Sequence, residues 1–135
     1  ELNGLLKQYL QDYEEVYDYR NIEVTIDEQD IFNVTMNESL AVALLTNLLK
    51  NAFVHNIDGG HIRITVTKNS ITFRNSGVEN PLDKEHIFER FYQGTKKEGS
   101  TGLGLAIADS ICRLQHLSIR YYFEQKEHCF EISRQ

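Results

Sequence analysis

The sequence predicts an α/β fold, in the form of an α+β two-layer sandwich with a mixed β-sheet and about three helices on one face. Two observations predict this class. Three segments carry apolar residues at helical spacing, and the segments between and after them alternate apolar and polar residues with a period of two. Helices and strands that interleave along a chain of this size pack as two layers around one core.

Composition sets the limits of the molecule. At 135 residues with 41% hydrophobic content and one proline, the chain fits a single domain over residues 1–135. The net charge of -6, concentrated in the first third, opposes binding to nucleic acid and to anionic membranes. No apolar run approaches a membrane span, and the two cysteines lack metal-ligand spacing. We expect a cytoplasmic domain of a longer protein, whose membrane anchor, if it has one, lies upstream.

The first half predicts a helix, two strands and a long helix. Residues 1–20 place leucines and tyrosines at helical spacing, and residues 22–26 alternate as in a strand. Residues 31–36 form a second β-prone run, which we expect to be a strand. Asn37 is a helix-capping residue, and the apolar segment 38–53 after it predicts a buried helix.

A hairpin and a long polar segment follow. Residues 62–66 and 71–75 alternate around a short turn, and Asn75 ends the second strand on the inward face. Residues 76–101 lose this pattern, apart from one short helical signal near Ile87. A stretch of this length is longer than most loops in compact domains, and such loops are commonly functional lids.

The last third predicts one helix and two strands. A glycine-rich turn at residues 99–105 leads directly into a helix that opens at Gly102, and residues 118–124 and 128–133 alternate as strands. Such a turn leaves backbone N–H groups and the positive end of a helix dipole facing outward, which suits phosphate. A plain flexible turn is the alternative explanation of the glycines. The predicted helix has one apolar face, formed by Leu103, Ile107, Ile111 and Leu114.

A polar stripe crosses the long apolar helix. Asn47, Asn51 and His55 follow one another at intervals of four residues, so they lie on one face among leucines and alanines. A binding role explains the stripe. For the helix taken alone, side chains satisfied by backbone groups explain it equally well.

Three motifs in this order resemble the catalytic domain of sensor histidine kinases, in the superfamily of gyrase, heat-shock chaperone, histidine kinase and mismatch-repair proteins. Residues 47–56 (NLLKNAFVHN) resemble its N box, residues 87–94 (IFERFYQG) its F box, and residues 99–107 (GSTGLGLAI) its second glycine box. The resemblance covers nearly the whole chain. It implies the Bergerat ATP-binding fold, which agrees with the strands and helices expected above.

The resemblance also implies roles for particular residues. Asn51 would coordinate the Mg²⁺ that bridges the phosphates of ATP, with Asn47 supporting the metal and phosphate shell and His55 beside the phosphates. Residues 78–101 would form the ATP lid, and Phe88 and Phe91 would pack the lid against the core rather than touch nucleotide. Main-chain N–H groups for phosphate would come from Gly102, Leu103, Gly104 and Leu105.

The first glycine box departs from the family pattern Asp-x-Gly-x-Gly. It reads Asn75-Ser76-Gly77-Val78-Glu79, so Gly77 remains while the aspartate that binds the adenine amino group is an asparagine. The amide oxygen of Asn75 is still an acceptor, although a neutral one is weaker. Glu79 replaces the second glycine, which implies a different lid hinge. Val54 and Gln93 replace a lysine and an arginine of many relatives.

The resemblance implies a protein-histidine kinase rather than a hydrolytic ATPase. Asn47 occupies the position of the general base that activates water in hydrolytic relatives, and an amide cannot take that proton. The acceptor histidine would lie on a separate dimerisation and histidine-phosphotransfer domain of the same homodimeric parent, with a response regulator downstream. Two alternatives stay open: a degenerate module that regulates or docks, and a serine kinase of the anti-sigma type.

Overall fold

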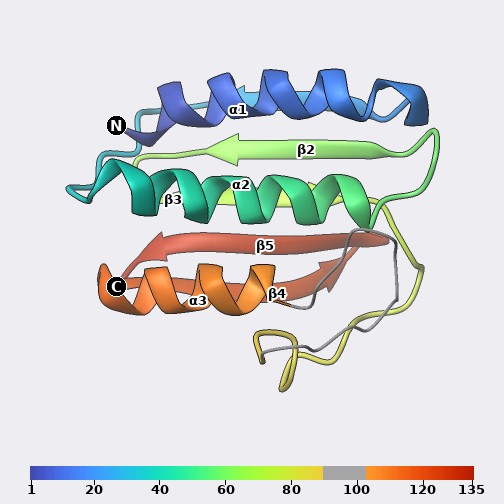
Figure 1. The fold of residues 1–135 in the computed structure, drawn as a ribbon. Coiled ribbons are helices and arrows are strands. Elements are labelled where there is room, and N and C mark those ends of the chain that lie inside the picture. Colours follow the sequence, from blue (N-terminus) through green and yellow to red (C-terminus); the bar gives the residue numbers. More distant parts are fainter. Residues whose placement is uncertain (90–102) are drawn as a thin grey trace.

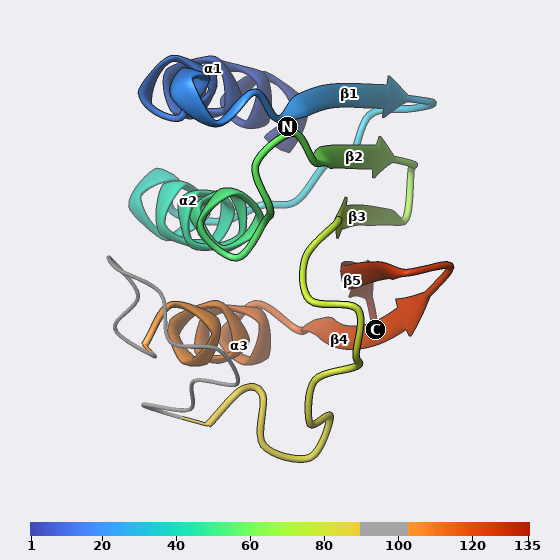
Figure 2. The ribbon, with the colours of Figure 1, turned by 90° about the vertical axis from the view of Figure 1, so that its right-hand side faces the viewer.

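The structure is a computed structural model that describes residues 1–89 and 103–135. Its five strands form a single sheet in the order β1-β2-β3-β5-β4, and α1, α2 and α3 cover one face of it (Figures 1 and 2). The predicted two-layer sandwich with a mixed sheet is therefore confirmed. The elements are α1 (Leu2–Val16), the 3-10 helix η1 (Asp18–Arg20), β1 (Glu23–Glu28), α2 (Glu38–Val54), β2 (His61–Val66), β3 (Ser70–Asn75), α3 (Gly104–Leu114), β4 (Leu117–Glu124) and β5 (Glu127–Arg134).

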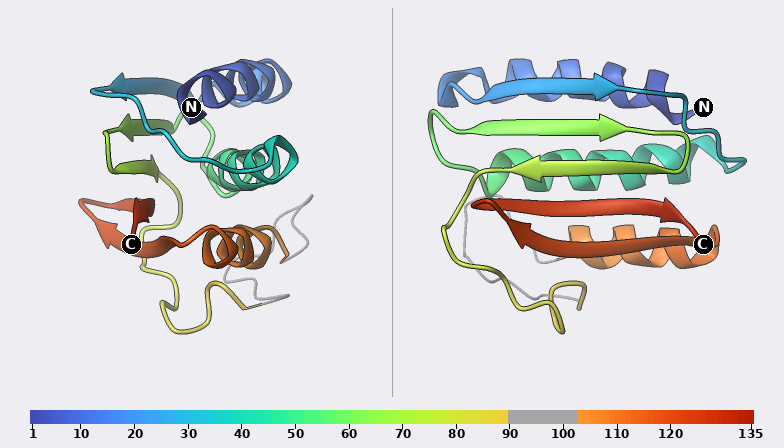
Figure 3. Two further views of the ribbon diagram at one scale, coloured as in Figure 1. Left: turned by 90° about the vertical axis from the view of Figure 1, so that its left-hand side faces the viewer. Right: turned by 180° about the vertical axis from the view of Figure 1, so that it is seen from behind.

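The sheet is mixed because one pairing differs from the others. β1 runs parallel to β2, whereas β2–β3, β3–β5 and β4–β5 are antiparallel. The view from behind shows the sheet face that carries no helix (Figure 3). Side chains alternate between the two faces, as a period of two requires. Most residues toward the helices are apolar, and the polar exceptions there include the paired residues Asn75 and His128.

The core lies between α2 and the centre of the sheet. Leu44, Leu45, Leu48 and Leu49 of α2 are at most 1% exposed. They pack on strand residues that are equally buried, and truncating any one of these leucines to alanine would cost about 2–5 kcal/mol. Asn37 caps α2 as predicted, because its Oδ1 accepts a hydrogen bond from the N–H of Ser39 at 2.7 Å. The buried partners from the sheet are Ile62, Ile64, Val66, Ile71, Phe73, Phe130 and Ile132.

The strand predicted at residues 31–36 is wrong. Phe32 is fully buried, but its backbone bonds to the start of α1 instead of to another strand: its N–H donates to Asn3 Oδ1 at 2.9 Å and its carbonyl accepts from Leu2 N at 3.1 Å. The segment therefore joins β1 to α2 as an ordered connection. The apolar residues that resemble a strand are explained by burial instead, since Phe32 fills the core beneath α1.

Two smaller predictions also change. Residues 84–88 form turns rather than a short helix, with Ile87 buried. The last helix begins at Gly104, with Leu103 at its N-cap, while Gly102 lies outside the described residues. Its apolar face is only partly covered, since Leu114 is 67% exposed. Among the helices of residues 1–89 and 103–135, none has the length and apolar content of a membrane span.

Candidate functional site

The polar stripe of α2 lies where the sequence places it. Asn47, Asn51 and the C-cap residue His55 are each half-buried along one side of the helix. Asn47 Nδ2 donates to the carbonyl of Ala43 at 2.7 Å. Bonding to a backbone group therefore explains the amide nitrogen of Asn47 but not its oxygen. The Asn51 side chain makes no hydrogen bond to any other described residue, which leaves its oxygen available to a ligand.

The start of α3 packs against this stripe. A Cβ added at Gly104 would lie 3.0 Å from Asn47 Oδ1, so the glycine allows the two helices to approach at this point. The N-cap residue of α3 is Leu103, whose side chain cannot accept a hydrogen bond from the first turn. The first-turn N–H groups and the helix dipole favour an anion there, and Gly104 and Leu105 supply part of that turn. The structure thus brings together the N box and the described part of the second glycine box.

Asn75 ends β3 beneath α2, and its side chain is in an unusual state. It is 2% exposed, and its Nδ2 donates to the carbonyl of Ser76 at 2.8 Å. Its Oδ1 is the only buried side-chain nitrogen or oxygen atom of the described residues that has no hydrogen-bond partner. Leaving a buried acceptor unpaired costs about 1–3 kcal/mol, so such an atom indicates a missing donor.

Gly77 brings the chain after β3 against the end of α2. A Cβ at this position would lie 2.7 Å from the backbone oxygen of His55 and 3.2 Å from Cδ2 of His128. Only glycine fits so close to a backbone atom. Asn75, Gly77 and His55 are therefore neighbours, as the first glycine box and the N box require of one shared site.

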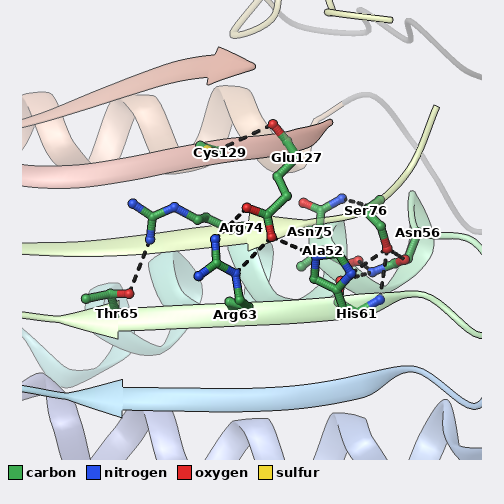
Figure 4. Close-up of polar contacts among 10 residues, drawn as sticks. All are labelled: Ala52, Asn56, His61, Arg63, Thr65, Arg74, Asn75, Ser76, Glu127 and Cys129. Carbon is green, nitrogen blue, oxygen red and sulfur yellow. Dashed lines mark hydrogen bonds and ion pairs between the residues drawn. The ribbon is translucent and has the colours of Figure 1, made fainter. Parts of the chain in front are cut away.

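A buried hydrogen-bond network, drawn in Figure 4, joins the end of α2 to β2 and to the end of β3. Ser76 Oγ donates to Asn56 Oδ1 at 2.6 Å and accepts from the N–H of His61 at 2.8 Å. Asn56, which is fully buried, donates to the carbonyls of Ala52 and His61. Sequence reasoning missed this network because the resemblance gives no role to Asn56 within the N box or to Ser76 within the first glycine box.

The hinge after the first glycine box is built from β4 and β5. His128 is 4% exposed, and its Nε2 lies 2.6 Å from the carbonyl oxygen of Val78, to which it donates. Its Nδ1 lies 2.7 Å from the hydroxyl of Tyr121, which accepts from the N–H of Leu82 at 2.9 Å. Burial lowers the pKa of His128. These bonds hold the segment around Glu79, where the family has its second glycine.

Arg20 of η1 caps the C-terminus of α2. Its guanidinium donates to the carbonyls of Phe53 and Asn56, the latter at 2.7 Å, and pairs with Asp58 at 2.8 Å. The last carbonyls of a helix lack the partners of the next turn, and a cation favours the negative end of the helix dipole. The sequence gives no sign of this cap, because the arginine lies far from the helix along the chain.

An ion-pair cluster lies on the open face of the sheet, on the side away from the helices (Figure 4). The carboxylate of Glu127 accepts from Arg63 at 2.6 and 2.9 Å, and His61 Nε2 lies 2.6 Å from it. Hydrogen bonds from Arg63 lower the pKa of Glu127, against the opposite effect of its burial. The cluster therefore supports the strands β2 and β5 from outside the candidate site.

The predicted lid is only partly described. Of residues 78–101, the structure describes residues 78–89, where Phe88 packs edge-on against Phe130 with ring centroids 6.2 Å apart. This confirms the packing role expected of Phe88. Gln93, Gly102 and the rest of the F box lie outside the described residues. Val54, which the resemblance sets at a lysine position of the family, is 7% exposed, so its side chain is buried.

The arrangement fits a purine nucleotide with a divalent cation. The buried acceptor of Asn75 suits an amino group on a base, the N-terminal turn of α3 suits phosphate, and the amide oxygen of Asn51 suits a hard cation. These three features lie along one side of α2, with Asn75 near its C-terminal end. The chemistry of each position indicates which part of a nucleotide it would contact.

Known proteins give an independent comparison. Residues 36–133 match the family described as histidine kinase-, DNA gyrase B-, and HSP90-like ATPase. The heme sensor protein HssS of Staphylococcus aureus (strain Newman) is 33% identical over 126 residues, which are 90% of this chain and 27% of that protein. The sensor histidine kinase RppB of Synechocystis sp. is 43% identical over 84 residues, 56% of this chain and 18% of that protein.

Solved structures agree. The nucleotide-free catalytic domain of histidine kinase ThkA superposes with a TM-score of 0.83 at 26% identity, covering 96% of this chain and 89% of that one. The chain thus spans a small part of the curated relatives it matches and most of an isolated catalytic domain. By the match over residues 36–133, the chain belongs to the family of histidine kinase-, DNA gyrase B- and HSP90-like ATPases.

Proposed function

We propose that the chain binds Mg²⁺-ATP and is the catalytic domain of a two-component sensor histidine kinase. The observation that carries the proposal is the alignment of Asn51, the N-terminal turn of α3 and the unpaired Oδ1 of Asn75 along one side of α2. The similarity to sensor histidine kinases over most of the chain supports it. The reaction is transfer of the γ-phosphate to a histidine on a separate dimerisation domain.

Each residue has a defined part in this proposal. Asn51 holds Mg²⁺ through its side-chain oxygen, and the metal, when bound, neutralises phosphate charge. Asn47 orients this shell, and His55 lies beside the phosphates. Asn75 accepts a hydrogen bond from the adenine amino group, with Gly77 against the base. Main-chain N–H groups at the turn into α3, from Gly102, Leu103, Gly104 and Leu105, bind phosphate.

Transfer is favoured over hydrolysis by the same residues. Asn47 has an amide where hydrolytic relatives need a base, and its Nδ2 is already bonded to Ala43. None of the five histidines is followed by an acidic residue, as the acceptor of the family usually is. The acceptor therefore belongs to the dimerisation and phosphotransfer domain of a homodimeric parent, and a response regulator receives the phosphate next. The setting we propose is cytoplasmic.

A degenerate regulatory module is the second candidate function. It is favoured by the changes in the first glycine box, where Asn75 and Glu79 replace the aspartate and a glycine, and by the buried Val54. The serine kinase alternative has less support, because the relatives described above are sensor histidine kinases. Nucleotide affinity separates the degenerate module from both kinases.

The test is calorimetric titration of the 135-residue chain with Mg²⁺-ADP. We expect saturable binding that requires Mg²⁺ and that Asn51→Ala abolishes. Lys50→Ala is the matched control, because this neighbour on α2 is exposed and should bind as the unaltered chain does. Absence of binding by the unaltered chain would favour the degenerate module, and unchanged binding by Asn51→Ala would overturn the metal site.

Transfer is tested with radiolabelled ATP. The chain alone should form no acid-labile phosphohistidine, whereas addition of the dimerisation hairpin of its parent should give label on that hairpin. Acid-stable label on a serine of a partner protein would instead indicate the serine kinase.

A further inference from the structure

We infer that Asn56 and Ser76 are positioning residues that fix the amide of Asn75 with its oxygen toward the base, and thereby select a 6-amino over a 6-oxo purine. The inference rests on the proposed function, because it concerns the base of the nucleotide bound there. It assigns specificity to two side chains that do not touch the base.

An asparagine at this position creates a problem that an aspartate does not have. A carboxylate presents an acceptor in either orientation, whereas an amide presents an acceptor at one end and donors at the other. If the Asn75 amide turned by half a rotation, Nδ2 would face the base. It would then favour the carbonyl of guanine or hypoxanthine over the amino group of adenine.

The structure fixes the orientation through one bond. Asn75 Nδ2 donates to the carbonyl of Ser76 at 2.8 Å, and Oδ1 is the end that is buried without a partner. The reverse orientation would place Oδ1 against the Ser76 carbonyl, so that two acceptors would meet. The polarity of Asn75 therefore depends on where the carbonyl of Ser76 points.

Ser76 is held on several sides. Its Oγ bonds to Asn56 Oδ1 at 2.6 Å and to the N–H of His61 at 2.8 Å, and its own N–H donates to the His61 carbonyl at 3.1 Å. Gly77, the next residue, is packed against the backbone of His55. The peptide group between Ser76 and Gly77 consequently has little room to rotate.

Asn56 is itself fixed in a single orientation. Its Nδ2 donates to the carbonyls of Ala52 and His61 at 3.1 and 3.0 Å, while Oδ1 accepts from Ile57 N–H at 2.8 Å and from Ser76. A Cβ at Gly60 would lie 2.3 Å from both Asn56 Oδ1 and Ser76 Oγ. Glycine at position 60 leaves the space in which the two side chains meet.

The experiment compares two nucleotides that differ at the 6-position of the purine, ADP and IDP, each with Mg²⁺. For the unaltered chain we expect ADP to bind at least about tenfold more tightly, because IDP sets a carbonyl against Asn75 Oδ1. Ser76→Ala should reduce this ratio severalfold, mainly by tightening IDP relative to ADP. Ser70→Ala is the control, since this serine at the other end of β3 also bonds through its hydroxyl.

A double-mutant cycle tests whether Ser76 acts through Asn75. In the Asn75→Ala background both nucleotides lose their contact with position 75, so Ser76→Ala should leave the ratio unchanged. Thermal unfolding checks that each variant is folded, and Ser76→Cys, which keeps the shape with a weaker donor, replaces Ser76→Ala if that variant unfolds. An intermediate ratio is expected for it.

The outcomes separate the inference from the proposed function. If the folded, unaltered chain binds neither nucleotide, the proposed function fails and the inference fails with it. If it binds ADP and Ser76→Ala leaves the ratio unchanged, the inference alone is overturned. An equal change of the ratio in the Asn75→Ala background would also overturn it, because Ser76 would then act by another route.

Discussion

The two ends of the candidate site are built in opposite ways. At the α3 end, Asn51 makes no hydrogen bond to the described residues, and the N-cap residue of α3 is a leucine, whose side chain cannot cap the helix. At the β3 end, Ser76, Asn56 and His128 are all hydrogen-bonded, and Asn75 Oδ1 alone is unpaired. The α3 end has several groups available to a ligand. The β3 end has one available acceptor, held among residues that are already hydrogen-bonded.

Under the proposed function, the contrast follows from what each end would recognise. Phosphate and Mg²⁺ are charged and tolerate small shifts of their ligands, so the α3 end can complete its structure when they bind. A base is distinguished by one donor or acceptor at a defined place, which requires groups held before binding. The sequence departs from the family at the rigid end, and it is there that supporting side chains accumulate.

The largest effect should come from Gly77→Ala. The new Cβ would meet the His55 backbone oxygen at 2.7 Å, and a backbone atom cannot move aside without displacing the end of α2. We expect a loss of about 2 kcal/mol in unfolding free energy and strongly weakened ADP binding. Urea denaturation and calorimetry measure the two effects.

Gly4→Ala serves as the control for this change. Its Cβ would meet only the Glu1 carboxylate at 3.3 Å, within α1. It should stabilise the chain by up to about 1 kcal/mol, because alanine favours a helix. Normal stability of Gly77→Ala would mean that the β3 end is not rigid.

An intermediate effect should appear when pH is lowered. The pKa of His128 is lowered by burial, so its contribution to stability is present above the ordinary histidine pKa of about 6.5 and is lost as pH falls through the lower folded value. Urea denaturation between pH 7 and pH 5 should show a steeper loss for the unaltered chain than for His128→Gln. The carboxylate of Glu127, whose pKa is also lowered, loses its contribution only at more acid pH.

The difference between the unaltered chain and His128→Gln excludes the contribution of the other histidines to the pH dependence of stability. Bonding to Glu89 raises the pKa of the exposed His86, which acts in the opposite direction and is shared by both proteins. Parallel pH curves for both proteins would show that His128 does not hold the hinge through its neutral form.

The smallest effect should come from Gly104→Ala at the α3 end. The added Cβ would lie 3.0 Å from Asn47 Oδ1, the end of a side chain that can rotate. Stability should change by less than about 1 kcal/mol, since alanine also favours the helix. Mg²⁺-ADP affinity should fall modestly by calorimetry. A loss as large as that of Gly77→Ala would remove the distinction between the two ends.

Much of the fold follows from local patterns. Alternation predicts β2, β3, β4 and β5 within one or two residues, and Asn37 marks the start of α2 because capping is a local interaction. The segment 31–36 defeats this reasoning. This segment packs against α1, which is distant from it in sequence. Periodicity carries no information about which element a residue covers.

The candidate site also has residues that local patterns predict and residues that depend on contacts distant in sequence. Asn51, Asn75 and Gly77 could be placed from motifs, because spacing along a helix or strand fixes where they point. The partners Asn56, Ser76 and Arg20 could not, because each acts on backbone groups that only the folded chain brings near. One sign was available for His128, which shares the inward period of Phe130 and Ile132 and is polar.

The cap formed by Arg20 also bears on where this folding unit can be cut. The family match begins at residue 36, yet β1 pairs along its whole length with β2, and Arg20 holds the last carbonyls of α2. A chain trimmed to residues 36–133 would keep every recognisable motif. It would lose α1, an edge strand and the cap, and the face of α2 beneath α1 would be open to water. The segment that identifies the family, residues 36–133, is thus shorter than the segment that folds as one unit.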